Sequence, residues 1–101
     1  MKILVLVINA SVHESVVDLL RALDVTGFTV SHVEGHGPHT GDDQSLTARD
    51  RVVGFVPRVR VDMVLTSGKL AAVLDALKDS GTSFAGHGTF WVAPVEHFGR
   101  F

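Results

Sequence analysis

The sequence predicts an α+β domain of the ferredoxin-like type, with the order β-α-β-β-α-β, because one short pattern occurs twice along the chain. Each copy combines a β-rich run, an amphipathic helical run and a second β-rich run. Each copy also carries the tripeptide Gly-His-Gly, once at residues 35–37 and once at residues 86–88. Two such halves form a four-stranded sheet with both helices on one face.

The first half contains expected strands at residues 2–8 and 28–34 and an expected helix at residues 12–23. The first strand is a continuous run of apolar side chains, which is typical of a strand that is buried on both faces. The helical run has apolar residues at helical spacing, and Ser11 with Glu14 forms a candidate capping box at its start.

The second half repeats this order. Residues 59–66 alternate as a strand does, residues 68–78 carry a helical apolar stripe, and residues 89–92 form a short last strand. Ser67 is the expected N-cap of the helix. Because the helices cover only one face of the sheet, the sequence predicts that a second copy of the chain covers the other face.

Composition restricts the classes of function. The chain has 101 residues, of which 46% are hydrophobic, so residues 1–101 are expected to fold as a single domain. A net charge of −2 with scattered Lys and Arg argues against nucleic-acid binding. The chain has no cysteine for disulfides or thiolate metal sites, and no run approaches the ~20 apolar residues of a membrane span. No targeting signal is recognisable, so we expect a cytoplasmic protein that does not insert into a membrane.

The segment 38–57 separates the two halves and is longer than an ordinary connection. Compact domains rarely keep an unstructured connection of more than ~12–15 residues unless it is a lid, a binding loop or disordered. The alternative is a β-hairpin that extends the two neighbouring strands. Even a hairpin of this length would project from the domain.

The two Gly-His-Gly turns are candidate anion sites. Glycines on both sides of one residue permit positive φ and leave backbone N–H groups open to phosphate oxygens. Arg58 and Arg100 are candidates for charge-assisted contacts to the same phosphates. The alternative is that the glycines form ordinary tight turns and the arginines are solvated. In an oligomer, the first turn of one subunit is a candidate neighbour of the second turn of the next.

Three stretches together resemble the PII signal-transduction proteins, which are trimeric ferredoxin-like sensors of adenine nucleotides. They are Thr-Gly-Phe-Thr-Val followed by Val-x-Gly-x-Gly at residues 26–37, Val-x-Phe-Val-Pro-Arg-Val-Arg at 53–60, and Thr-x-x-x-Gly-x-Gly-x-x-Trp-Val at 82–92. The segment 38–57 also has the length of the family's T-loop. The resemblance covers nearly the whole chain and implies a homotrimer.

The resemblance implies that ATP, ADP or AMP binds in the cleft between neighbouring subunits as an effector, with no obligatory cofactor. The adenosine contacts would be Gly27, Phe28, Thr29, Met63 and Val64. The phosphate contacts would be Gly35, His36, Gly37, Pro38, Arg58, Gly86, His87, Gly88, Thr89 and Arg100. The T-loop would change shape with the ligand and dock on a membrane transporter or a metabolic enzyme.

The sequence departs from the family pattern at several of these positions. Thr89 replaces a basic residue of the phosphate turn, and His87 replaces an acidic one. His39 replaces the glutamine that helps to hold magnesium and 2-oxoglutarate, and Arg51 stands where some members carry a modified tyrosine. Each lost charged hydrogen bond costs about 1.5–3 kcal/mol. We therefore expect a weaker hold on phosphate and a preference for ADP or AMP over MgATP with 2-oxoglutarate.

Some divergent PII-like proteins resemble regulators of carbon metabolism, so bicarbonate is a candidate second effector at the base of the T-loop. The expected effector and T-loop residues are His39, Thr40, Gly41, Arg49 and Arg51.

Two other functions compete with nucleotide sensing. The chain has six histidines, and His32, His36 and His39 form a candidate divalent-cation site. A metal-responsive PII-like protein is therefore the alternative. The third possibility is an oligomerisation module in which both glycine turns are only turns. No nucleophile, base or acid has motif-quality spacing, so an enzyme is not expected.

Overall fold

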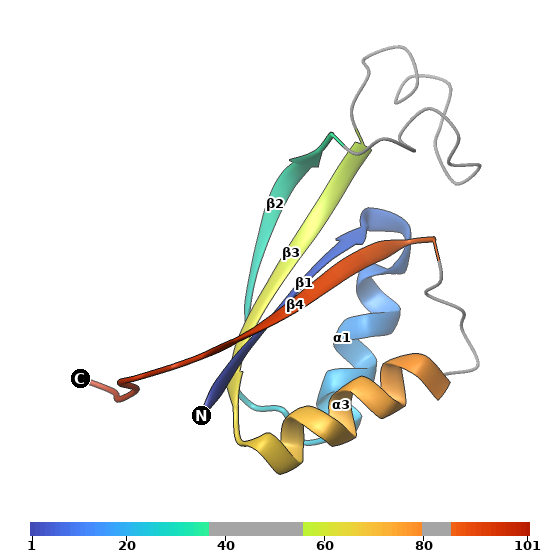
Figure 1. The fold of residues 1–101 in the computed structure, drawn as a ribbon. Coiled ribbons are helices and arrows are strands. Elements are labelled where there is room, and N and C mark those ends of the chain that lie inside the picture. Colours follow the sequence, from blue (N-terminus) through green and yellow to red (C-terminus); the bar gives the residue numbers. More distant parts are fainter. Residues whose placement is uncertain (37–55, 80–85) are drawn as a thin grey trace.

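A computed structural model describes residues 1–36, 56–79 and 86–101. Within these ranges the chain forms four strands, two α-helices and one short 3-10 turn, arranged as in Figure 1. The strands are β1 (Lys2–Asn9), β2 (Thr29–Gly35), β3 (Val56–Leu65) and β4 (Gly88–Pro94), and the helical elements are η1 (Ala10–Val12), α1 (His13–Ala22) and α3 (Ser67–Asp79). No helix in these ranges is long and apolar enough to cross a bilayer.

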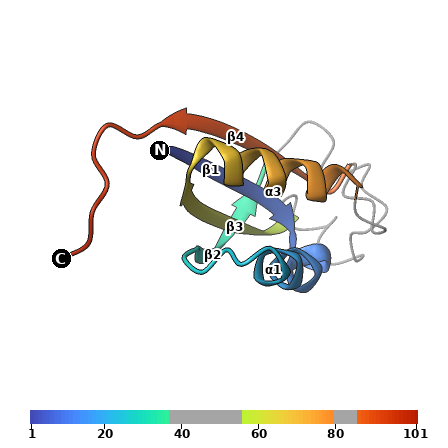
Figure 2. The same cartoon turned by 90° about the horizontal axis from the view of Figure 1, so that it is seen from below.

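The strands form one sheet in the order β2-β3-β1-β4, and every neighbouring pair is antiparallel. Both helices lie on the same face of this sheet (Figures 1 and 2). The predicted ferredoxin-like architecture is therefore confirmed. β1 pairs with β3 on one side and with β4 on the other, so it is an inner strand of the sheet.

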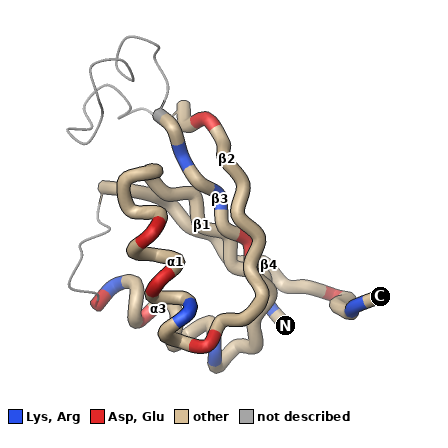
Figure 3. Tube along the Cα trace, turned by 180° about the vertical axis from the view of Figure 1, so that it is seen from behind, with Lys and Arg blue, Asp and Glu red and all other residues tan. Residues whose placement is uncertain are grey.

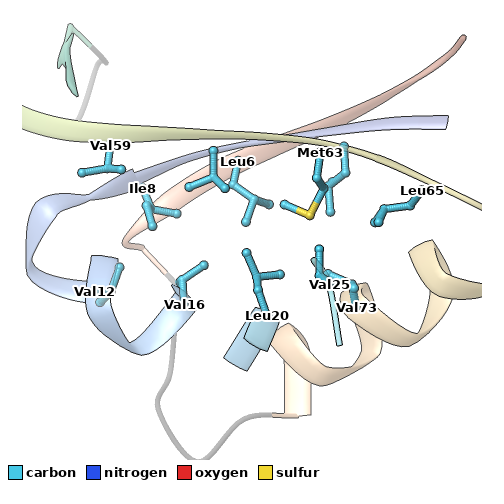
Figure 4. Close-up of a cluster of buried hydrophobic side chains, with 12 residues drawn as sticks. Leu6, Ile8, Val12, Val16, Leu20, Val25, Val59, Met63, Leu65 and Val73 are labelled. Carbon is cyan, nitrogen blue, oxygen red and sulfur yellow. The ribbon is translucent and has the colours of Figure 1, made fainter. Parts of the chain in front are cut away.

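The core lies between the sheet and the two helices (Figure 4). Leu4, Leu6 and Ile8 of β1 point toward the helices together with alternate residues of β3. The helical side contributes Val12, Val16, Leu20, Val25 and Val73, all of them buried. Burial of one such side chain contributes about 1.5–3 kcal/mol, so both predicted helical stripes hold the layers together.

The starts of the two helices differ from the predicted caps. Ser11 lies inside η1, and no side chain caps α1 or η1, so the predicted capping box is wrong. The physical reason is that a capping residue needs extended backbone angles, whereas Ser11 already belongs to a helical turn. At α3 the hydroxyl of Thr66 accepts a hydrogen bond from the Lys69 N–H at 3.2 Å, so the cap lies one residue before Ser67.

β3 begins earlier than the predicted strand 59–66, and its first residues pair with β2 only. Gly35 pairs with Val56 and Glu34 pairs with Pro57, whereas the last partner of β1 is Arg58. A proline is tolerated where a strand has a neighbour on one side only, because fewer backbone bonds are required there. The rest of the predicted T-loop, residues 38–55, lies outside the described residues.

The face of the sheet opposite the helices carries a charged pair beside an aromatic ring. The Arg60 guanidinium donates to both carboxylate oxygens of Asp62 at 2.9–3.2 Å and lies 5.7 Å from the centroid of the Trp91 ring. This hydrogen bond, together with the carboxylate's charge, raises the pKa of Arg60. On β4, Phe90 and Trp91 are 51% and 45% exposed. The last strand therefore presents large apolar side chains to its surroundings.

Candidate functional site

One end of the sheet contains a pocket of about 610 Å³. It lies between the loop that precedes β2, the end of β3 and the C-terminal tail. Its lining includes all five residues that the resemblance places around an adenosine: Gly27, Phe28, Thr29, Met63 and Val64. Phe98 and Arg100 of the tail also line it, so Arg100, a predicted phosphate contact, lies in this chain beside the predicted adenosine contacts.

The loop beside this pocket is held by the C-terminal cap of α1. Asp24 adopts a positive φ of 58°, the Asp24 N–H donates to the Arg21 carbonyl, and the Val25 N–H donates to the Leu20 carbonyl. These two bonds form a Schellman motif, in which Val25 also packs on Leu20. The Lys69 ammonium donates to the Leu23 carbonyl at 2.6 Å and ties the start of α3 to the same loop.

The end of β2 and the start of β4 lie at the opposite end of the sheet, on its two different edges. β2 ends at Gly35, and β4 begins at Gly88, which pairs with Ile8 near the end of β1. Arg58 of β3 lies at the same end, because it pairs with Asn9 on one side and Val33 on the other. Antiparallel pairing therefore places Arg58 beside the end of β2, with β1 between it and the start of β4.

A polar network crosses three strands at this end. Arg58 Nη1 donates to Asn9 Oδ1, and Asn9 Nδ2 lies 3.3 Å from His87 Nδ1. The Asn9 N–H also donates to the His87 carbonyl at 2.7 Å. Asn9 is only 2% exposed. The sequence analysis did not predict a role for Asn9. The signal for it was a polar side chain directly after the apolar run of the first strand.

Two glycines of these turns make close contacts that an added side chain would disturb. A Cβ atom on Gly35 would overlap the Arg58 side chain, and one on Gly88 would lie 2.6 Å from the Val7 carbonyl oxygen. Gly86 has a φ of +77°, which favours glycine. The absence of a side chain at residue 35 thus leaves the space in which Arg58 lies.

The remaining predicted phosphate residues are only partly described. Thr89 is exposed on β4, and exposed His36 places its Nε2 3.2 Å from Glu34 Oε2. Gly37 and Pro38 lie outside the described residues, as do the T-loop positions His39, Thr40, Gly41, Arg49 and Arg51.

The candidate metal residues are not gathered into one cluster by the described part of the chain. The His32 ring makes an edge contact with the His13 ring at 6.3 Å between centroids. His36 interacts instead with Glu34. Within residues 1–36, 56–79 and 86–101, no three His, Asp or Glu side chains are placed to hold a metal ion.

Charge is mixed over the molecule. Figure 3 shows Lys and Arg positions interspersed with Asp and Glu positions on the helices and strands that the structure describes. Among the described residues, Arg58 is a cation at the end of the sheet that carries the turns, and it reaches His87 through Asn9. An anion bound there would accept a charge-assisted hydrogen bond from Arg58.

The fold and its two glycine turns define a small ferredoxin-like protein of the PII-like regulatory class. A family model described as "Protein of unknown function (DUF3240)" matches residues 1–101. The nitrogen regulatory protein P-II of Cereibacter sphaeroides is 31% identical over 84 residues, which is 82% of this chain and 75% of that protein. GlnK of Escherichia coli K12 is 28% identical over 97 residues, or 95% of this chain and 87% of that protein.

The chain therefore belongs to the DUF3240 family and is a divergent member of the PII signal-transduction proteins. The nitrogen regulatory protein P-II of Rhizobium meliloti is a further relative, 30% identical over 82% of this chain and 75% of its own length. These relatives are regulatory proteins, so this chain is a regulator rather than an enzyme.

Proposed function

We propose that this protein is a PII-like regulator that binds an adenine nucleotide between the subunits of a homotrimer. The observation that carries the proposal is the separation of the two groups of predicted contacts. The predicted adenosine contacts line the pocket near Met63, whereas the described phosphate contacts other than Arg100 lie with Arg58 toward the other end of the same strand. At a rise of ~3.3 Å per residue these two positions are about 17 Å apart. A nucleotide that uses both groups is therefore best held by two neighbouring subunits.

The surface of the single chain supports assembly. β4 exposes Phe90 and Trp91, and no helix in the described ranges lies on the open face of the sheet. Two of the charges on that face, Arg60 and Asp62, neutralise one another. Burial of a paired ion costs far less than burial of an isolated one, so a subunit interface can form over this pair.

The residues around Arg58 favour a nucleotide with few phosphate groups. Arg58 supplies the positive charge there, and Thr89 offers a hydroxyl where the family carries a cation. ADP or AMP is accordingly the proposed effector, ahead of MgATP. In this proposal the nucleotide changes the segment 38–57, which regulates a membrane transporter or a metabolic enzyme in the cytoplasm. Bicarbonate is the proposed second effector, which would link the protein to carbon status.

Calorimetry with ADP, AMP and ATP on the purified oligomer, with and without bicarbonate, tests this function. We expect saturable binding that is lost in Arg58→Ala. Arg21→Ala is the matched control, because Arg21 is an exposed arginine of α1 that lines neither the pocket nor the turns. Absence of binding to all three nucleotides would overturn the proposal. Titration with zinc or copper would then test the metal-responsive alternative at His32, His36 and His39.

A further inference from the structure

We propose that Asn9 is a positioning residue that fixes the ring of His87 as a hydrogen-bond donor through Nε2. The proposal rests on the network of Arg58, Asn9 and His87 that joins the two glycine turns. It also deepens the proposed function, since it states how the second turn meets a phosphate oxygen.

The hydrogen-bonding roles follow from Arg58. A guanidinium only donates, so the Asn9 atom that faces Arg58 must be the amide oxygen. The other end of that amide is an NH2 group, which only donates as well. His87 Nδ1, 3.3 Å from it, must then accept and carries no proton. In a neutral imidazole the proton is therefore on Nε2.

The backbone holds this arrangement in register. The Asn9 N–H donates to the His87 carbonyl at 2.7 Å, so residues 9 and 87 are joined through both backbone and side chain. Asn9 is 2% exposed, which limits competition from water for its amide. The half-buried His87 ring thus has one nitrogen committed to Asn9 and the other available as an N–H.

The consequence concerns the charge of the ligand. A donor at Nε2 beside the Gly86 and Gly88 backbone stabilises an anionic oxygen such as that of a phosphate. The opposite tautomer would present a lone pair and repel the same oxygen. Asn9 therefore enables the turn to accept a phosphate without a positive charge on His87, at a position where the family carries an acidic residue.

The test is a long-range proton–nitrogen NMR spectrum of the purified full-length chain with 15N-labelled histidine. It is recorded at about pH 9, above the range in which histidine ordinarily titrates, and His87→Gln assigns the signals. The wild-type ring is expected to show protonated Nε2 and unprotonated Nδ1. In Asn9→Asp the new carboxylate only accepts, so Nδ1 is expected to become protonated.

A second variant covers the case in which Asn9→Asp fails to fold. Arg58→Ala removes the donor that orients the Asn9 amide, so His87 is expected to show a mixture of tautomers. Protonated Nδ1 in the wild type would overturn the proposal. So would an unchanged His87 spectrum in Arg58→Ala, or in a folded Asn9→Asp.

Ligand binding separates this proposal from the one on which it rests. Asn9→Asp is expected to weaken the affinity for ADP by about tenfold or more and to leave the affinity for adenosine unchanged. The reason is that only ADP carries phosphates that reach His87. If the wild type binds no nucleotide, the proposed function fails while the NMR result still decides the role of Asn9. If ADP binds and His87 carries its proton on Nδ1, the proposed role of Asn9 is wrong and the proposed function stands.

Discussion

Gly35 shows how a missing side chain can set a functional group in place. A Cβ atom at residue 35 would overlap Nε and Cδ of Arg58, which belong to the flexible end of that side chain. Gly35→Ala is therefore expected to fold normally but to displace the guanidinium from Asn9. Loss of one charged hydrogen bond to phosphate predicts about a tenfold weaker ADP affinity by calorimetry.

Gly68→Ala is the control for that substitution, because a Cβ at residue 68 meets nothing within 4 Å and the residue lies in the first turn of α3. It should bind ADP as the wild type does. Arg58→Ala removes the guanidinium altogether, so it should weaken ADP binding more than Gly35→Ala does, and the double variant should behave as Arg58→Ala does. Wild-type affinity in Gly35→Ala would mean that the position of Arg58 does not matter for the ligand.

At the scale of the element, the end of α1 carries a strained residue beside the pocket. Asp24 has a positive φ of 58° and places a carboxylate at a helix C-terminus, where negative charge is unfavourable. Asp24→Gly and Asp24→Ala both remove the charge, but only glycine removes the strain. We expect the glycine variant to have a free energy of unfolding about 1 kcal/mol higher than the alanine variant.

Urea denaturation at one fixed protein concentration measures this difference, because the stability of an oligomer depends on concentration. Equal stability of the two variants would show that the cap is not strained. Both variants retain the Lys69 bond to the Leu23 carbonyl, since it uses the backbone of the loop. The comparison therefore isolates the backbone conformation of residue 24.

The elements themselves were predictable from periodicity, whereas their exact ends were not. The apolar run of β1 and the stripes of both helices follow from burial, which the sequence records directly. Thr66 and Ser67 are adjacent and chemically alike, so only the backbone decides which of them caps α3. The Asn9 network required the register of three strands, and register depends on contacts that are distant along the chain.

At the scale of the whole molecule, the two half-sites lie at opposite ends of one sheet, and this separation allows a complementation test. Arg58→Ala removes the arginine of the predicted phosphate site. Gly27→Trp fills the pocket of the predicted adenosine site. A Cβ atom at residue 27 meets nothing within 4 Å, so this substitution fits without a clash at the backbone. Each variant alone is expected to lose ADP binding.

Co-expression of the two variants is expected to restore binding. In a mixed trimer one interface combines the intact Arg58 end of one subunit with the intact pocket of its neighbour, so one site per mixed trimer should bind ADP with wild-type affinity. Calorimetry gives the number of sites and their affinity separately, and the two variants mixed without subunit exchange provide the control. No recovery in a confirmed mixed oligomer would mean that both halves act within one chain. The nucleotide would then have to span the sheet of a single subunit, which its separated contacts make unfavourable.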